Sequence, residues 1–100
     1  MTFHDVILDS QEIKYFCEAH HIVKLSLFGS ILTEAFHAGS DVDVLVEFEP
    51  GHTPGFLHMA VLEAKLSAML DRKVDLRTPS ELSKYFRDEV LSKSEVQYGR

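Results

Sequence analysis

The sequence predicts one small domain of the α+β (mixed α/β) class, with a small mixed β-sheet covered by helices on one face. Three observations predict this class. The 100 residues suffice for a modest hydrophobic core without disulfides. Segments with helical periodicity alternate with segments that have strand periodicity. No linker, repeat or low-complexity segment interrupts them, so residues 1–100 are expected to form a single unit.

Four helices are expected, because apolar residues recur at helical spacing behind residues that favour helix starts. Their expected positions are residues 10–20 behind the Asp9 cap, residues 30–36, the segment that begins at Thr53-Pro54, and the segment behind the Thr78–Glu81 capping box. The third helix has a predicted buried stripe of Met59, Leu62, Leu66, Met69 and Leu70. The last has a stripe of Leu82, Tyr85, Phe86 and Val90.

Three strands are expected, at residues 22–28, 41–48 and 73–76. Successive side chains of a strand alternate between its two faces. The second strand therefore has Asp41 and Asp43 on one face and its valines on the other. The third strand places Asp75 opposite its core-facing residues, Val74 and Leu76.

The formal net charge is −6, and it is unevenly distributed. Residues 1–71 hold 3 Lys/Arg against 11 Asp/Glu, whereas residues 72–100 hold 7 against 5. An acidic body argues against direct nucleic-acid binding, which needs clustered Lys and Arg. The basic C-terminal third fits either a solvated helix face or a contact with an acidic surface.

Cys17 is the single cysteine, so no internal disulfide is expected, and it reads as a small core residue with no histidine–acid partner. No apolar run resembles a signal peptide or a membrane span. A reducing, cytoplasmic setting without membrane contact is therefore expected. The six histidines show no metal-ligand spacing and are expected at the surface or core edge.

Asp41 and Asp43 are the first candidate site residues. Their Cα atoms would lie about 6.6 Å apart along a strand, so that their carboxylates could converge on a metal ion. A bare Asp pair could equally lie on the solvated face of a strand end. Upstream, Gly29 and Ser30 stand between a strand and a helix start, an arrangement that aims backbone N–H groups at a phosphate. A phosphate cradle facing an acidic metal site is equipment for phosphoryl or nucleotidyl transfer.

Gly29-Ser30, ten residues and then Asp41-Val42-Asp43 resemble the GSx10DxD signature of the minimal nucleotidyltransferases. These small polymerase-beta-like proteins, MNT or MntA, are the antitoxins of HEPN/MNT toxin–antitoxin pairs. The similarity extends over most of the chain, through residues 41–48, 54–56, 73–79 and 85–89. Asp75, a third carboxylate on a later strand, strengthens it. The resemblance implies the nucleotidyltransferase (polymerase-beta-like) fold.

The resemblance also implies an activity. Two Mg²⁺ ions would lie between Asp41, Asp43 and the triphosphate of ATP, and Gly29 and Ser30 would hold the phosphates. Asp75 would complete the metal-binding carboxylate set and orient the attacking hydroxyl or accept its proton. AMP would pass to a tyrosine of the cognate HEPN ribonuclease toxin and silence it.

Two departures from the family pattern bear on nucleotide affinity. Relatives often carry arginine at the positions of Thr33 and His37, and arginine binds phosphate through charge-assisted bonds. One alternative is therefore a non-catalytic antitoxin that neutralises the toxin by direct binding. Another is an unrelated domain whose Asp pair binds Ca²⁺ or nothing. The intact set of Asp41, Asp43 and Asp75 favours the enzyme.

Overall fold

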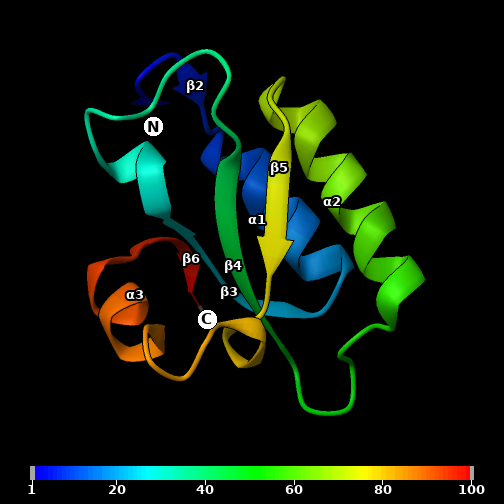
Figure 1. Cartoon of the computed structure of the whole chain (residues 1–100). Helices are drawn as coiled ribbons and strands as arrows, with labels where there is room; N and C mark the ends of the chain where they lie inside the picture. The colour runs from blue at the N-terminus through cyan, green and yellow to red at the C-terminus, as the bar shows by residue number, and fades with distance from the viewer. Residues whose placement is uncertain (1, 100) are drawn as a thin grey trace.

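A four-stranded mixed sheet organises the chain, which the computed structural model describes over residues 2–99. The strands lie in the order β5-β4-β3-β6 (Figure 1). Their bounds are β3 (Ile22–Phe28), β4 (Val42–Phe48), β5 (Val74–Arg77) and β6 (Glu95–Gly99). Strands β4 and β5 are parallel, and β3 is antiparallel to both β4 and β6. A two-stranded ribbon, β1 (Thr2–Phe3) and β2 (Val6–Ile7), precedes the sheet.

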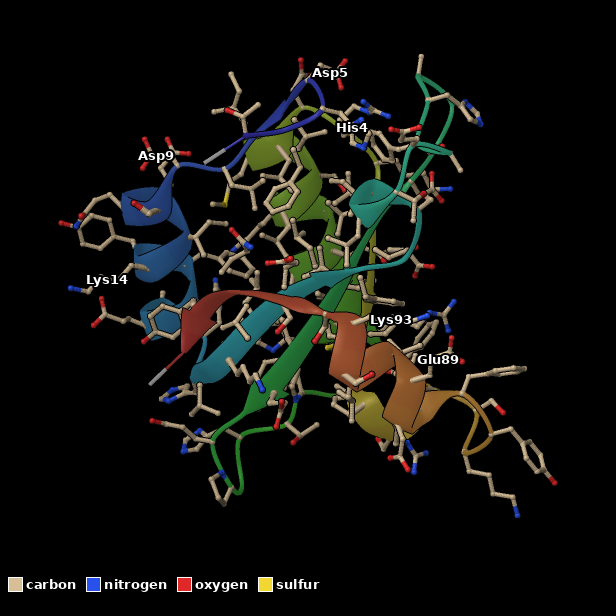
Figure 2. The ribbon with its side chains drawn as sticks, turned by 90° about the vertical axis from the view of Figure 1, so that its left-hand side faces the viewer. His4, Asp5, Asp9, Lys14, Glu89 and Lys93 are labelled. Carbon is tan, nitrogen blue, oxygen red and sulfur yellow. The ribbon has the colours of Figure 1, made fainter. Side chains whose placement is uncertain are left out.

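Helices α1 (Ser10–Ala19) and α2 (Phe56–Leu70) cover one face of the sheet, as predicted (Figure 1). Helix α3 (Arg87–Lys93) lies on the opposite side, as the rotated view in Figure 2 shows. Two 3-10 helices, η1 (Gly29–Leu32) and η2 (Pro79–Glu81), complete the elements. The predicted fold class is confirmed. The prediction that the helices cover one face of the sheet holds for α1 and α2 but not for α3. Within residues 2–99, no helix has the length and apolar character that crossing a bilayer requires.

The core lies between the sheet and helices α1 and α2. It contains the alternating valines of β4, whose exposure is at most 1%, together with the apolar side chains of β3 and the inner stripe of α2. Cys17 is fully buried, and burial raises the pKa of its thiol to about 12. The thiol is therefore an inert core group, as predicted. Asp9 caps α1 by accepting hydrogen bonds from the backbone N–H groups of Gln11 and Glu12 (Figure 2).

Side chains of α2 hold the edge strand β5. The Ser67 hydroxyl accepts a hydrogen bond from Val74 N–H at 3.0 Å, and Glu63 Oε2 accepts one from Leu76 N–H at 2.9 Å. These bonds satisfy backbone donors that an edge strand otherwise exposes to solvent. They therefore help to fix the position of Asp75, which stands between those two residues.

Two predicted helix bounds are wrong. The expected helix 30–36 is the short 3-10 helix η1, which ends at Leu32. Thr33 ends it, because its backbone is extended and its hydroxyl bonds to Ser30 O and Ala35 N–H instead of continuing the helix. Helix α2 begins at Phe56 with Gly55 as its N-cap, not at Thr53-Pro54.

The C-terminal region departs most from prediction. The segment behind the Thr78–Glu81 capping box is only η2, and α3 starts later, at Arg87. The predicted stripe is not buried, since Tyr85 is 81% exposed and Phe86 is 62% exposed. The chain then forms β6, which pairs with β3 and was not predicted. No prediction covered β1 and β2 either.

Candidate functional site

Asp43 and Asp75 stand in register on neighbouring parallel strands. Asp43 of β4 is the Cα partner of Asp75 on β5 and of Phe28 on β3, so these three residues form one row across the sheet. Adjacent strands are about 4.8 Å apart, and paired residues share a face. This row, called the Asp row after Asp43 and Asp75, lies on the face opposite the core valines, away from α1 and α2. Asp41 directly precedes β4. The predicted placement of Asp43 and Asp75 opposite the core-facing residues is confirmed, whereas Asp41 lies just outside the strand that was predicted to begin with it.

The environment of Asp43 disfavours its negative charge. Burial has the largest effect, and the carboxylates of Asp75 and Asp41 add to it, raising the pKa of Asp43 to about 6. The positive charge of Arg77 acts in the opposite direction. A carboxyl group so close to like charges gains from a nearby cation, which relieves the same repulsion that raises its pKa.

Two positively charged side chains pair with Asp75 and Asp41. The sequence analysis did not identify either of them as a partner of these carboxylates. Arg77 Nε lies 3.3 Å from Asp75 Oδ1, and Lys73 Nζ lies 3.9 Å from Asp41 Oδ2. Arg77 stands two residues after Asp75 on β5, so both share one face. The alternation that identified the acidic face would have placed Arg77 beside it as well.

Gly29 packs directly on the Asp43 carboxylate. Its φ is +77°, in the left-handed region that favours glycine. A Cβ at this position would overlap Asp43 Oδ2 and lie 3.2 Å from Asp43 Cγ. Ser30 follows in η1, and its carbonyl oxygen accepts bonds from the backbone N–H and hydroxyl of Thr33. The turn from β3 to η1 is thus fitted to the Asp row, with no room for a side chain at Gly29.

Arg72 holds the loop that leads into β4, and sequence reasoning missed it. Its guanidinium donates to the carbonyl oxygens of His37 at 2.9 Å and Ser40 at 3.0 Å, and to Asp5 Oδ1 at 3.0 Å. The group lies 4.5 Å from the centroid of the Phe36 ring. Nothing in the local sequence pattern signals this role, because the contacts join distant segments. Arg72 therefore holds in place the loop that ends immediately before Asp41.

Thr33 and His37, the two expected departures from the family pattern, make local contacts. The Thr33 hydroxyl bonds to Ser30 O, and His37 Nδ1 accepts a bond from Gly39 N–H at 3.0 Å. Both side chains are exposed. They support turns in the chain, and the cations near the site come from Arg77, Lys73 and Lys93 instead.

The carboxylates suit a hard divalent cation that is bound together with a phosphate ligand. Asp41, Asp43 and Asp75 supply oxygen ligands, and Mg²⁺ typically takes one or two carboxylates and completes its shell with water and phosphate oxygens. Their oxygens do not all lie within 4.8 Å of one another, a condition met between residues 2 and 99 only by a histidine–glutamate group elsewhere.

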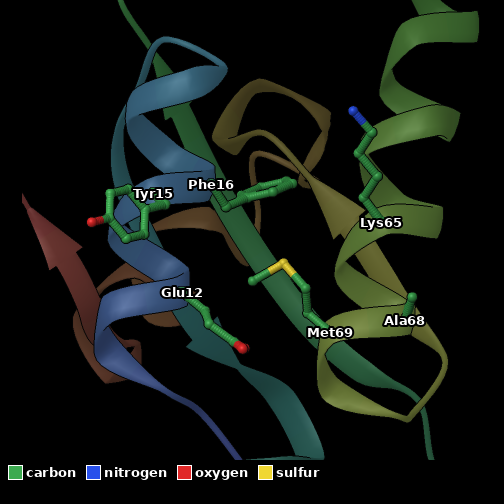
Figure 3. A pocket seen from close by; sticks show the side chains of 6 residues that line it. All are labelled: Glu12, Tyr15, Phe16, Lys65, Ala68 and Met69. Atoms are coloured by element: carbon green, nitrogen blue, oxygen red, sulfur yellow. The ribbon is translucent and has the colours of Figure 1, made fainter.

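A cavity of about 660 Å³ adjoins the glycine turn. Its walls come from η1 and α3, and Figure 2 shows Glu89 and Lys93 on α3, which pair at 2.9 Å. The lining is mixed apolar and charged: Phe28, Gly29, Leu32, Thr33, Phe86, Glu89, Val90, Lys93 and Glu95. Its size falls within the range of small-molecule sites. Another cavity, of about 700 Å³ between α1 and α2, lies on the other side of the sheet and takes no part in the Asp row (Figure 3).

Known proteins resemble this chain both in sequence and in structure. The family model described as a nucleotidyltransferase domain matches residues 10–96. A curated relative from Methanocaldococcus jannaschii, named as a candidate protein adenylyltransferase, is 29% identical over 75 residues, which cover 75% of this chain and 78% of that protein. The solved structure of a candidate minimal nucleotidyltransferase has a TM-score of 0.69 at 30% identity, with 85% of each chain covered.

Two solved toxin–antitoxin complexes contain chains of the same fold. One, a complex with AMP-PNP, gives a TM-score of 0.74 at 24% identity, covering 93% of this chain and 75% of that one. The other is a tri-AMPylated HEPN toxin of Shewanella oneidensis with its MNT antitoxin, with a TM-score of 0.66 at 22% identity, covering 91% and 70%. At these identities the likeness concerns the fold.

Proposed function

The chain belongs to the nucleotidyltransferase domain family, and from this premise we propose that it is an antitoxin that transfers AMP from ATP to a tyrosine of a cognate HEPN ribonuclease toxin. The modification would inactivate the toxin by adding charge and bulk at its active site. The observation that carries the proposal is the row of Asp43 and Asp75 with Gly29 packed against it. The relative named for protein adenylylation and the complex with an AMPylated HEPN toxin support it.

In this proposal the triphosphate of ATP lies over the Asp row, beside Gly29 and Ser30. Asp41, Asp43 and Asp75 would hold Mg²⁺, with two ions expected, and these would neutralise charge on the phosphates. The adenosine occupies the cavity next to Gly29, whose apolar walls include Phe28 and Phe86. Lys93 in the same cavity supplies a cation for the phosphates.

The transfer is a displacement at the α-phosphorus. The tyrosine oxygen of the toxin forms a bond to the α-phosphorus, the bond to the β-phosphate oxygen breaks, and pyrophosphate leaves. Asp75 orients the tyrosine hydroxyl and accepts its proton. Before nucleotide binds, Arg77 pairs with Asp75. Arrival of the phosphates draws the guanidinium of Arg77 toward them, which releases the carboxylate to act as the base.

The toxin would approach the side of the sheet that carries α3. Tyr85 and Phe86 are exposed there, immediately before α3, and Phe86 also lines the cavity beside Gly29. Lys84 Nζ lies 5.4 Å from the centroid of the Tyr85 ring. Exposed aromatic residues are enriched at protein interfaces, and charged residues at their rim keep the free surface soluble. This surface would therefore bring the acceptor tyrosine to the nucleotide.

The alternative is a non-catalytic antitoxin that covers the toxin. It draws on the same exposed Tyr85 and Phe86 and on the absence of the two arginines at Thr33 and His37. Catalysis is favoured because burial and like charge make the Asp row costly to maintain without a cation. The proposal includes a single domain over residues 1–100 and a reducing, cytoplasmic setting. It does not include direct binding of nucleic acid.

The first test uses substoichiometric amounts of this chain. With ATP and Mg²⁺, a small amount should inactivate an excess of the toxin, which should stay inactive after the two proteins are separated, because an enzyme turns over. Intact-mass spectrometry of the toxin should show increments of one AMP residue. The double variant Asp41→Asn/Asp43→Asn, with an unchanged circular dichroism spectrum, should leave the toxin unmodified.

One-to-one protection that needs no ATP and survives the double substitution would establish the covering antitoxin instead. Omission of Mg²⁺ with EDTA present tests the metal in the same assay. Unchanged transfer under that condition would remove the metal from the proposal while leaving the transfer itself.

A further inference from the structure

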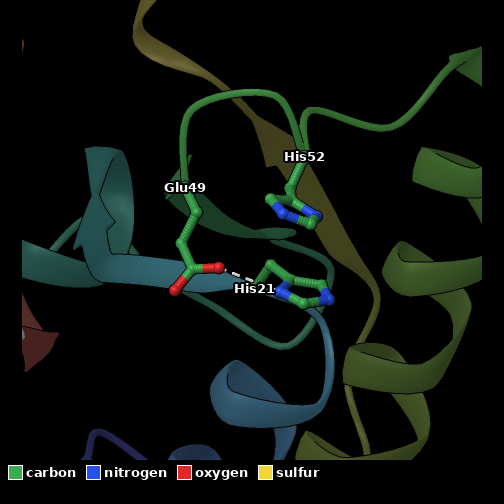
Figure 4. Close-up of side chains that lie close together, drawn as sticks. All are labelled: His21, Glu49 and His52. Atoms are coloured by element: carbon green, nitrogen blue, oxygen red, sulfur yellow. Dashed lines mark hydrogen bonds and ion pairs between the residues drawn. The ribbon is translucent and has the colours of Figure 1, made fainter.

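Two histidines and a glutamate gather at the end of the sheet opposite the Asp row. His21 lies in the turn between α1 and β3, and Glu49 and His52 lie in the loop between β4 and α2 (Figure 4). Each offers one ligand atom, and these three atoms all lie within 4.8 Å of one another. We propose that His21, Glu49 and His52 bind a transition-metal cation of the Zn²⁺ type, at a site separate from the aspartates.

The backbone brings these side chains together. Glu49 N–H donates to His21 O at 2.8 Å, and His52 N–H donates to Glu49 O at 2.9 Å. The pairing of Ile22 with Phe48 anchors both segments in the sheet. His21 has a φ of +58°, an uncommon conformation for a residue other than glycine or asparagine. The ligand atoms thus come from two tight turns that hydrogen bonds hold in fixed relation, which lowers the entropic cost of binding an ion.

The side chains present a ligand set that suits zinc. His21 Nδ1 lies 2.9 Å from Glu49 Oε2, and the His21 and His52 rings stack with centroids 3.9 Å apart at 17°. Figure 4 shows the Glu49 carboxylate beside His21, with the His52 ring over it. Two imidazole nitrogens and a carboxylate oxygen leave one position of a tetrahedral Zn²⁺ for water. The His21 side chain is 51% exposed, so an ion in solvent can reach the group.

An ion pair alone explains only part of this arrangement. The bond between His21 and Glu49 does not include the side chain of His52, whose ring stacks on that of His21. The two stacked rings are nearly parallel, and a metal binds an imidazole nitrogen in the plane of its ring, so a rotation of the exposed His52 ring about its side-chain bonds would bring its nitrogen toward an ion held by His21 and Glu49. With the rings so placed, a shared cation would bind all three residues together, because one ligand atom of each already lies within 4.8 Å of the others.

The site is distinct from the Asp row in place and in chemistry. Glu49 stands six residues after Asp43 along β4, which corresponds to roughly 20 Å. Imidazole ligands favour Zn²⁺ and related ions, whereas the aspartates offer only the hard oxygens that Mg²⁺ prefers. Binding at the histidines would link the α1–β3 turn to the β4–α2 loop and stabilise the folded chain by mass action.

The test is a titration of the untagged, EDTA-treated full chain with ZnCl₂ at neutral pH. Calorimetry should show one equivalent of Zn²⁺ bound, and thermal unfolding should shift to higher temperature. His52→Gln and Glu49→Gln should each weaken Zn²⁺ binding roughly tenfold or more. Substitution of residues that only hydrogen-bond to a metal ligand already lowers metal affinity by this much. His58→Gln is the matched control, because His58 is an exposed histidine whose ring faces His20 and lies outside the group.

Two further arms keep the proposal falsifiable. The double variant Asp41→Asn/Asp43→Asn should bind Zn²⁺ as the original chain does, and excess Mg²⁺ should not displace it. Co²⁺ in place of Zn²⁺ should give visible absorption that His52→Gln changes and His58→Gln does not. Zn²⁺ affinity that is unaffected by His52→Gln and Glu49→Gln, or reduced equally by His58→Gln, would overturn the proposal. So would the loss of Zn²⁺ binding in the aspartate variant.

Discussion

Gly29 is the residue at which backbone conformation and site geometry meet. Gly29→Ala places a methyl group in a left-handed conformation and against the Asp43 carboxylate. Gly51→Ala is the control, because Gly51 has a φ of +83° and nothing lies within 4 Å of the position that a methyl group would take there. Each substitution should cost about 1 kcal/mol in unfolding free energy from the positive φ. Gly29→Ala should cost about 1–3 kcal/mol more from overpacking.

The same pair of variants separates site from fold in activity. Gly29→Ala should abolish AMP transfer because Asp43 must move, whereas Gly51→Ala should retain it. Denaturant titration and the transfer assay measure the two effects. Equal stability losses for the two variants, with transfer retained by both, would show that the contact between Gly29 and Asp43 has no consequence.

The raised pKa of Asp43 makes the free energy of unfolding depend on pH. Its pKa is raised from 3.8 to about 6 on folding, so the folded state holds its proton more tightly than the unfolded state. The contribution to stability is fully present below about pH 3.8 and is lost as the pH rises through about 6. Asp43→Asn should therefore stabilise the metal-stripped chain by about 1–2 kcal/mol at alkaline pH, after allowance for solvent screening, and by little at acid pH.

Urea titrations of both proteins in EDTA, at pH values on either side of this window, measure the difference. A stability difference between Asp43→Asn and the original chain that does not change with pH would contradict the raised pKa. Addition of Mg²⁺ and ATP to the original chain should remove its disadvantage at alkaline pH, if the aspartates bind the metal as proposed.

Sequence reasoning at the residue scale succeeds where one periodic rule decides the outcome. Strand alternation places Asp43 and Asp75 on one face, and the register of β4 and β5 makes them neighbours. The contact of Gly29 with Asp43 depends on a φ value and on the position of another strand, so the sequence motif indicates the glycine without its physical reason. The group of His21, Glu49 and His52 shows no ligand spacing, because two loops bring its members together and His21 lies 28 positions before Glu49.

Among the elements, the loop that leads into β4 depends on Arg72. Its side chain is only 16% exposed and joins Asp5 to the carbonyl oxygens of the loop. Arg72→Met keeps the aliphatic part of the side chain and removes these bonds. It should cost about 2–3 kcal/mol in unfolding free energy, because charge-assisted bonds at a mostly buried group are lost.

Hydrogen exchange locates the effect of Arg72→Met. The amide of Ser40, which donates to His37 O, should exchange faster in the variant. Lys73→Met is the control, since its side chain is 79% exposed and should change stability by no more than about 0.5 kcal/mol. Equal effects of the two substitutions would mean that Arg72 does not hold the loop.

Elements that combine a cap with a repeating apolar face are predicted well. Helix α1 and strand β3 match their predicted positions, and Leu62, Leu66 and Leu70 form the buried stripe of α2. The failures occur where tertiary structure overrides a local pattern. Residues 82–86 have helical spacing, yet the sheet provides no surface for their apolar face, so Tyr85 remains in solvent. Strand β6 forms because β3 offers it an edge, and the alternation of Val96 and Tyr98 with polar residues fits a strand but is too short to predict one.

At the scale of the whole molecule, exposed aromatic residues lie on α1, at the start of α2 and beside α3, and the last two places provide a matched comparison. Tyr85 is 81% exposed beside α3, and Phe56 is 86% exposed at the start of α2. Tyr85→Ser should raise the toxin concentration needed for half-maximal modification, since the proposed toxin surface includes it. Phe56→Ser should not, and neither should change the midpoint of thermal unfolding by much, because both side chains are already in solvent.

Surface plasmon resonance with immobilised toxin and steady-state AMP transfer give the two readouts. A stronger effect of Phe56→Ser than of Tyr85→Ser on both would place the toxin at the α2 side instead. The mixed sheet itself, with helices packed on it, was predictable from the alternation of elements, whereas the position of α3 on the other side was not.

The order of strands in the sheet has a consequence during synthesis. Strand β3 is central, with β4 on one side and β6 on the other, yet β6 follows the other three strands of this sheet in the sequence and leaves the ribosome after them. Until residues 95–99 emerge, the nascent chain has an unpaired strand edge at β3, next to the turn that carries Gly29. Open edges invite pairing with other chains. Ribosome stalling or premature termination before residue 95 should therefore produce aggregation-prone fragments, and only a chain translated through β6 would cover this edge of β3.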